Sequence, residues 1–161
     1  MKLLFVAALL VAAPALAQER LIEPSAPDSA RQTAITVLKH LAAGDLEQAA
    51  ALSNAPSQRL ELLRGYRDVV GEEEFKRLFG RFLAPENQLI AEVAIGPRRL
   101  LVWELADASR RRAGQFYIEV DGKFLLDDVP SRERTELRRV LRRYRAQQDK
   151  GRWDPRLRGD D

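Results

Sequence analysis

The sequence contains no cysteine and only one histidine among its 161 residues. Without cysteine, these residues can form no disulfide, thiolate metal site, thiol nucleophile or lipid-modified cysteine. The histidine, His40, lies about 200° around its predicted helix from Leu38, because successive helical residues turn by about 100°. It therefore faces away from the apolar stripe that includes Leu38. We expect it in water rather than at a metal or catalytic site.

Motifs that hold cofactors or nucleic acids are also missing. The sequence has no glycine-rich phosphate loop, no nucleophile elbow and no cluster of residues with metal-ligand spacing. It also lacks the interleaved aromatic and basic residues that stack nucleic-acid bases. We therefore expect no cofactor, no metal and no nucleic-acid partner. Stability has to come from packing, for which a chain of this length has room.

The one long apolar run lies at the beginning of the sequence. Lys2 supplies a basic start, Leu3–Ala13 is apolar, and Ala15–Ala17 has the small residues of a cleavage site. These features predict a signal peptide over residues 1–17, cleaved after Ala17, and a periplasmic or secreted mature protein. An uncleaved anchor is the alternative, but an anchor needs about 20 apolar residues. Residues 18–27, which are polar and contain two prolines, are predicted to be flexible.

Four stretches before residue 84 have the periodicity of helices. Apolar residues recur in them at spacings of three and four, which places these residues on one helical face. Phe75, Phe79 and Phe82 form the clearest stripe, which predicts that the last of these helices packs on a sheet. The predicted helices span residues 28–43, 46–53, 57–70 and 72–83.

Four stretches rich in β-branched and aromatic residues follow, separated by turn residues. Asp121-Gly122 predicts a two-residue hairpin turn with positive φ at both positions. In the strand before it, Phe116 and Ile118 alternate with Gln115 and Tyr117, which predicts one buried face. Helices followed by an antiparallel meander predict an α+β fold, with N-terminal helices packed on a curved sheet. The predicted strands span residues 89–95, 99–106, 115–120 and 123–129.

Arginine is concentrated after the sheet. The chain has 27 basic and 24 acidic residues, a formal charge of +3. A C-terminal arginine-rich helix is predicted over residues 131–145, and a basic patch on it could contact an anionic surface. Alternatively, arginine is frequent throughout this chain and the patch is only a solvated face. Residues 147–161 are predicted to form a disordered tail. The patch consists of Arg138, Arg139, Arg142 and Arg143.

Two runs of residues resemble a known family. The run VLKHLAAGDLEQAAAL over Val37–Leu52 looks like the opening of nuclear-transport-factor-like (cystatin-like α+β) domains, where a Gly-Asp turn joins two helices. The hairpin over Asp121–Asp128 is similar to the closing strands of that family. The resemblance covers residues 28–129 and, with the C-terminal helix, gives one domain over 28–146. It implies a bent sheet around an apolar cavity that binds a small molecule, carries a catalytic acid or base, or is filled.

Asp127 is the candidate catalytic residue. With a two-residue turn at Asp121-Gly122, Phe116 opposes Asp127, so this carboxylate points to an apolar face and Asp128 to the other face. Burial would raise the pKa of Asp127 and suit it to act as a general acid or base. The alternative is a structural pair with an arginine, or contact with solvent at the rim.

Three aromatic side chains have polar groups that could line the implied cavity. Tyr66, Trp103 and Tyr117 are the candidate ligand-binding residues. Each combines a large apolar surface with one hydrogen-bonding group, which suits a pocket wall. Ordinary packing in the core or at its rim is the alternative for all three.

The sequence leaves three functions open. The first is an exported, non-catalytic domain that binds a small apolar ligand or a cell-envelope protein. The second is an isomerase, cyclase or hydrolase that uses Asp127 for proton transfer. The third is an electrostatic adaptor that contacts an anionic surface through residues 131–145. The arginine-rich helix departs from the pattern of the nuclear-transport-factor-like family. The sequence is consistent with either a monomer or a homodimer.

Overall fold

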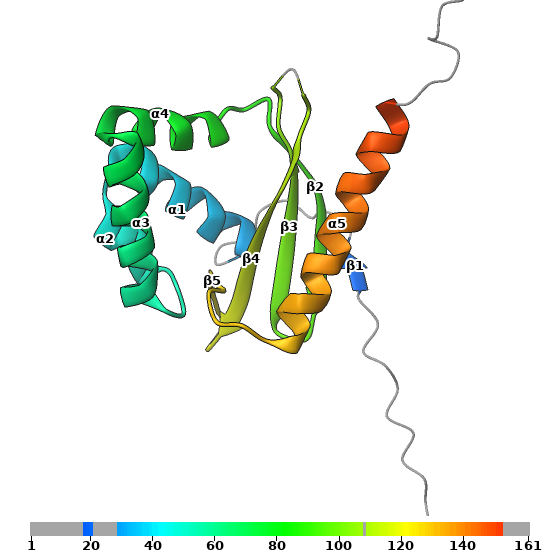
Figure 1. The fold of residues 1–161 in the computed structure, drawn as a ribbon. Helices are drawn as coiled ribbons and strands as arrows, with labels where there is room; N and C mark the ends of the chain where they lie inside the picture. The colour runs from blue at the N-terminus through cyan, green and yellow to red at the C-terminus, as the bar shows by residue number, and fades with distance from the viewer. Residues whose placement is uncertain (1–17, 21–28, 108, 153–161) are drawn as a thin grey trace, which may run out of the picture.

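The computed structural model of the chain describes residues 18–20, 29–107 and 109–152 (Figure 1). The predicted signal peptide and residues 153–161 of the predicted tail lie outside the described residues. In the described part, helices come first, an antiparallel sheet follows, and a long helix comes last. The α+β fold predicted from the sequence is confirmed. No helix of this part is both long and apolar enough to cross a membrane.

The sheet is an antiparallel meander with the strand order β1-β2-β3-β4-β5. Alternating β-branched, aliphatic and aromatic residues form its strands, as such residues fit a pleated and packed surface. The four strands from β2 onward match the predicted ones to within three residues at each end. The strands are β1 (Gln18–Arg20), β2 (Gln88–Ile95), β3 (Arg98–Glu104), β4 (Arg112–Val120) and β5 (Lys123–Leu126).

The hairpin of β4 and β5 has the predicted turn and register. Asp121 and Gly122 adopt φ values of 50° and 75°, the left-handed conformation that this turn requires. Because side chains alternate between the faces of a strand, this register sends the side chains of consecutive residues after β5 to opposite sides. Val120 lies opposite Lys123, and Ile118 lies opposite Leu125. Just beyond β5, the Asp127 N–H donates a hydrogen bond to the Phe116 carbonyl at 2.9 Å.

Four helices precede β2: α1 (Ala30–Ala43), α2 (Leu46–Ala51), α3 (Pro56–Val70) and α4 (Glu72–Phe82). Ser29 caps α1, since its hydroxyl accepts a hydrogen bond from the Gln32 N–H at 3.1 Å. Gly44 ends α1 with φ of 85°, which glycine adopts without steric cost.

The sheet is buried on both faces. One face packs against the N-terminal helices, and Leu101 of β3 and Tyr117 of β4 belong to that core. The other face packs against α5 (Arg132–Arg152), which contributes Leu137, Val140 and Leu141. Burial of each such aliphatic side chain contributes about 1.5–3 kcal/mol. The prediction of one buried face for β4 is therefore wrong: Tyr117 is fully buried because helices cover the side that its polar neighbours suggested was open.

Helix α4 packs mainly against α1 and α3. Phe75 is fully buried, and its ring centroid lies 5.9 Å from that of Tyr66 on α3 and 4.7 Å from that of Phe79. Phe82, one turn later, is 37% exposed. The phenylalanine side chains of α4 therefore pack mainly against other helices, whereas the sequence predicted that they pack against the sheet. Figure 1 shows α4 lying across the top of α3, away from the strands.

Two predicted boundaries need correction. Gln18–Arg20, assigned to a flexible segment, form β1, because they pair with residues 92–94 of β2 in an antiparallel ladder. Residues 147–152, assigned to the tail, continue α5. The Gln148 side chain there donates hydrogen bonds to the carbonyl oxygens of Ser109 and Arg110, which attach this turn of the helix to the β3–β4 loop.

Candidate functional site

Asp127 lies at the end of β5, in a buried polar cluster between the sheet and α5. Its side chain has no exposed surface. Arg98 Nε of β3 donates a hydrogen bond to Oδ2 at 2.9 Å, and Asn54 Nδ2 donates one to Oδ1 at 2.9 Å. Arg98 also lies 3.5 Å from Glu133 of α5. Both carboxylate oxygens of Asp127 are therefore occupied by donors, one of them a cation.

Asp128 points to the other side of the chain and binds the α2–α3 loop. Its Oδ2 accepts hydrogen bonds from Ser53 Oγ at 2.6 Å and from Arg59 Nε at 2.8 Å, and its Oδ1 contacts Arg59 Nη2. The Asp128 N–H donates to Asn54 Oδ1 at 2.7 Å. Next to these contacts, Leu126 N–H donates to the Leu52 carbonyl at 2.7 Å. The two aspartates thus join the helices, the sheet and α5 at one point.

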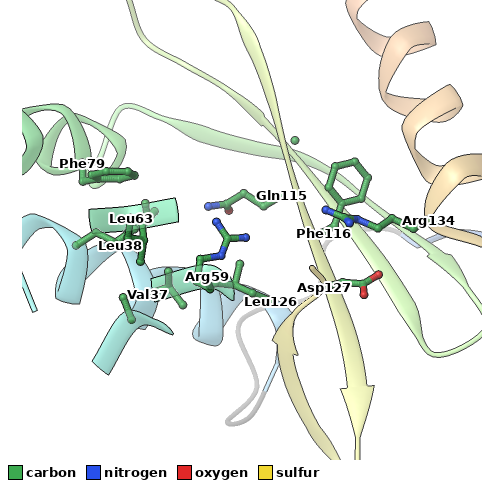
Figure 2. A pocket seen from close by; sticks show the side chains of 13 residues that line it. Val37, Leu38, Arg59, Leu63, Phe79, Gln115, Phe116, Leu126, Asp127 and Arg134 are labelled. Carbon is green, nitrogen blue, oxygen red and sulfur yellow. The ribbon is translucent and has the colours of Figure 1, made fainter. Parts of the chain in front are cut away.

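This geometry favours a structural role for Asp127 over proton transfer. A general acid or base needs an open path between its carboxylate and a substrate atom. The Asp127 oxygens are shielded and hydrogen-bonded, and Figure 2 shows the carboxylate pointing away from Leu126 and Val37. The structure contains the arginine pair that the sequence left open as the alternative. The assignment of Asp127 as catalytic stays a prediction.

A cavity of about 200 Å³ opens beside this cluster, between the helices and β4 (Figure 2). Its apolar wall comes from α1, α3 and α4, where Leu38, Leu63 and Phe79 point toward the space. Its polar side has Arg59 and Gln115. On the α5 side, the Arg134 guanidinium lies against the Phe116 ring, 5.6 Å from the ring centroid. One end of the cavity is therefore apolar, and the other is polar, lined by Arg59, Arg134 and Asp127, of which Arg59 and Asp127 are each in an ion pair.

A second cavity of about 180 Å³ continues the first along β4. The two share Leu38, Phe79, Gly114 and Gln115 as lining residues. We call the two cavities together the β4 groove. Individual ligand pockets commonly measure about 300–1,000 Å³, a range that the two cavities reach only together. The additional lining residues of the second cavity are Phe82, Trp103, Leu105 and Ala113.

The groove runs along a part of β4 that has no outer neighbour. β5 ends at Leu126, opposite Tyr117, and the last ladder hydrogen bond joins Asp127 and Phe116. Because hydrogen-bonding directions alternate along a strand, the N–H and C=O of Gly114 point to the same side as those of Phe116, away from β3. They face the groove edge beyond the end of β5. The groove therefore offers backbone hydrogen-bonding groups as well as side chains.

Glycine is required at position 114 by packing from the α5 side. A Cβ atom there would collide with both δ carbons of Leu141 and would lie 3.1 Å from Leu100 Cδ1. The absence of a side chain lets α5 approach β4 at this point. This requirement gave no signal in the sequence, because α5 is distant from Gly114 along the chain.

The three predicted aromatic residues are separated by the structure. Trp103 lines the groove, and its indole N–H donates to Gln115 Oε1 at 2.8 Å. Tyr66 is 43% exposed on α3 and packs on Phe75. Tyr117 is fully buried, its hydroxyl has no hydrogen-bond partner in the part of the chain that the structure describes, and burial raises the pKa of this phenol above its ordinary value. Neither tyrosine lines the two cavities.

Sequence reasoning missed the groove residues Arg59, Gln115 and Arg134, because nothing local marks them as neighbours. The predicted basic patch, in contrast, is one exposed surface of α5. No group of three or more metal-ligating side chains occurs in the described ranges.

Comparison with known proteins found no match: no family model, no curated protein and no solved structure resembles the chain significantly. The similarity to nuclear-transport-factor-like domains therefore stays a prediction based on the residues quoted above.

Proposed function

We propose that the mature chain is an exported binding domain whose β4 groove holds an apolar ligand with an anionic end. The observation that carries this proposal is the polarity of the groove. Leu38, Leu63 and Phe79 form its apolar wall, and arginine side chains lie at the end near Asp127. Most ligand pockets combine an apolar lining with a few polar groups that fix the orientation of the ligand.

Arg134 is the residue that would bind the anionic end. Its Nη1 donates to the Asp128 carbonyl at 3.1 Å, but its buried Nε has no hydrogen-bond partner within residues 18–20, 29–107 and 109–152. Among the described residues, no carboxylate forms an ion pair with it, whereas Arg59 is paired with Asp128 and Arg98 with Asp127. A carboxylate that accepts a hydrogen bond from this cation would gain a charge-assisted bond, stronger than a neutral one.

Fluorescence of Trp103 can test this proposal, with Trp153 replaced by phenylalanine so that one indole reports. The probes are dodecanoate and dodecanol, which share an acyl-length tail and differ in charge at the head. We expect saturable binding of dodecanoate, with weaker binding of dodecanol. Arg134→Gln should weaken dodecanoate binding by about ten- to a hundredfold, since a hydrogen bond to a charged group contributes about 1.5–3 kcal/mol, and should leave dodecanol binding unchanged.

Two further variants distinguish binding of the charged head group of the probe from binding of its apolar tail. Phe82→Ala shortens the apolar wall at a partly exposed position and should weaken both probes alike. Arg132→Gln removes an exposed arginine from the same helix as Arg134 and serves as the matched control. Absence of binding by both probes would refute the proposal, as would equal losses in the Arg132 and Arg134 variants.

Export rests on the sequence alone. The predicted cleavage would leave Gln18, the first residue of β1, at the new N-terminus. Mass spectrometry of the protein from a periplasmic fraction should give the mass of residues 18–161. A full-length mass, or recovery only from the cytoplasm, would contradict this part of the proposal.

A further inference from the structure

We propose that the outer face of α5 binds a membrane surface of anionic lipid through its arginine side chains. This face, which we call the α5 arginine face, lies opposite the stripe of Leu137, Val140 and Leu141 that packs on the sheet. Figure 1 shows α5 along one side of the molecule, where none of the other described helices and strands covers its outer side. The exposed arginines of the face are Arg132, Arg138, Arg139, Arg142 and Arg143.

Charge is concentrated on this helix. Residues 132–148 contain seven arginines and two glutamates, a net charge of +5, although the whole chain has a charge of only +3. The rest of the chain therefore has a net charge of −2. A surface with this asymmetry meets an anionic partner in one preferred orientation.

Ion pairing separates this face from the other arginines of the chain. Arg64 and Arg67 of α3 lie within 4.0 Å of a carboxylate, and so do Arg98 and Arg99 of β3 and Arg112 of β4. These arginines are neutralised within the fold. Abundant arginine is thus matched by acidic residues over most of the structure.

The arginine face lacks this neutralisation. Among the residues that the structure describes, Arg138, Arg142 and Arg143 have no ion pair, and Arg139 alone is paired, with Glu136 at 2.6 Å. If arginine were merely frequent in this chain and had no function, ion-paired and unpaired arginine side chains would be mixed over the whole surface. In the part of the chain that the structure describes, Arg31, Arg81, Lys39 and Lys123 also have no ion pair, but they are scattered over α1, α4 and β5, whereas Arg138, Arg142 and Arg143 lie together on one face of one helix. This concentration of unpaired charge indicates an anion outside the chain.

The form of the strip favours a membrane over a nucleic acid. The exposed side chains between residues 132 and 147 of the face are arginine, threonine, alanine and glutamine, with one aromatic residue, Tyr144, half-buried toward the sheet. Proteins that bind single-stranded nucleic acid add aromatic platforms for the bases. A straight helix with charge along one side fits a flat anionic surface, to which each arginine contributes separately.

Vesicle sedimentation tests this proposal with the full mature chain. We expect binding to vesicles of phosphatidylcholine mixed with phosphatidylglycerol, and none to pure phosphatidylcholine. Each arginine near such a surface changes the partition coefficient about fivefold, so replacing Arg138, Arg139, Arg142 and Arg143 by glutamine should lower it about a thousandfold. Binding should also fall steeply with salt, because the Debye length shrinks from about 10 Å at 0.1 M to about 3 Å at 1 M.

Two matched variants make the result decisive. Glutamine at Arg64, Arg67, Arg77 and Arg81 removes the same charge from α3 and α4 and should leave most of the vesicle binding. Lysine at the four α5 positions keeps the charge and should also retain it. Loss of binding in either variant, salt-independent binding, or binding of duplex DNA without binding of anionic vesicles would overturn the proposal. The circular dichroism spectrum of each variant should match that of the unsubstituted chain, which checks that the variant is folded.

Discussion

Replacement of Asp127 by asparagine is the sharpest test of the polar cluster. The carboxamide keeps the volume of the side chain but removes its charge and turns one acceptor into a donor. Asn54 cannot rotate to compensate, because its Oδ1 accepts the Asp128 N–H at 2.7 Å. The new amide group must therefore face either Arg98 Nε or Asn54 Nδ2, both of which are donors.

The expected cost is about 3 kcal/mol in the free energy of unfolding. Removal of one partner from a buried ion pair costs about 3–5 kcal/mol, because the other charge stays buried without compensation. Arg98 has 13% of its side-chain surface exposed and lies 3.5 Å from Glu133, which replaces part of the lost interaction. A domain of this size has a total stability of about 5–15 kcal/mol, so the variant should stay folded but melt about 10 °C lower.

Urea unfolding followed by circular dichroism measures this cost. Asp121→Asn is the matched control: it makes the same change of charge at an exposed turn position where asparagine tolerates positive φ, and it should change stability by less than about 0.5 kcal/mol. Arg98→Met combined with Asp127→Leu should recover part of the loss, because an apolar pair replaces a buried ion pair, while Asn54 Nδ2 still lacks the acceptor that Asp127 supplied. Wild-type stability of Asp127→Asn would refute this reasoning and favour a functional role for the carboxylate.

Other substitutions test other parts of the structure. Gly114→Ala should lower stability by about 2 kcal/mol through its collision with Leu141, and Leu141→Ala should cost less in that background than in the wild type; additive costs would contradict the proposed contact. Tyr117→Phe should raise stability at neutral pH by about 1 kcal/mol, because it removes a buried hydroxyl without a partner; a loss would indicate that the hydroxyl is bonded. Since the folded pKa of Tyr117 is raised above its unfolded value near 10, wild-type stability should fall as the pH rises above about 10, and the phenylalanine variant should lack this part of the decline. Ser29→Ala should cost about 1 kcal/mol in thermal unfolding through loss of the hydrogen bond from Gln32, and an unchanged melting temperature would show that the cap is dispensable.

The elements of this fold could be predicted because their signals are local. Gly44 ends α1 by its own backbone preference, and Asp121-Gly122 sets the register of β4 and β5 through two residues in sequence. That register is enough to predict that Asp127 and Asp128 point to opposite faces. The arginine face of α5 is also local, since its residues follow one another on a single helix.

The site could be predicted only in part. Trp103 was a candidate and lines the groove, but Tyr117 was also a candidate and is buried in the core, because helices cover a face of β4 that its own sequence pattern left open. Arg134 and Arg59 reach the same cavity from α5 and α3. Their meeting depends on how two layers pack on the sheet, which no local pattern records.

The sequence by itself determined the order of helices and strands, the hairpin register and the concentration of arginine after the sheet. These depend on backbone preferences and periodicities that act within a few residues. Only the tertiary structure decided that Asp127 pairs with Arg98, that α4 packs on helices and leaves a groove beside β4, and that Arg138, Arg142 and Arg143 of α5 have no carboxylate partner among the described residues. Those outcomes depend on contacts between residues tens of positions apart, where packing of whole elements sets the distances.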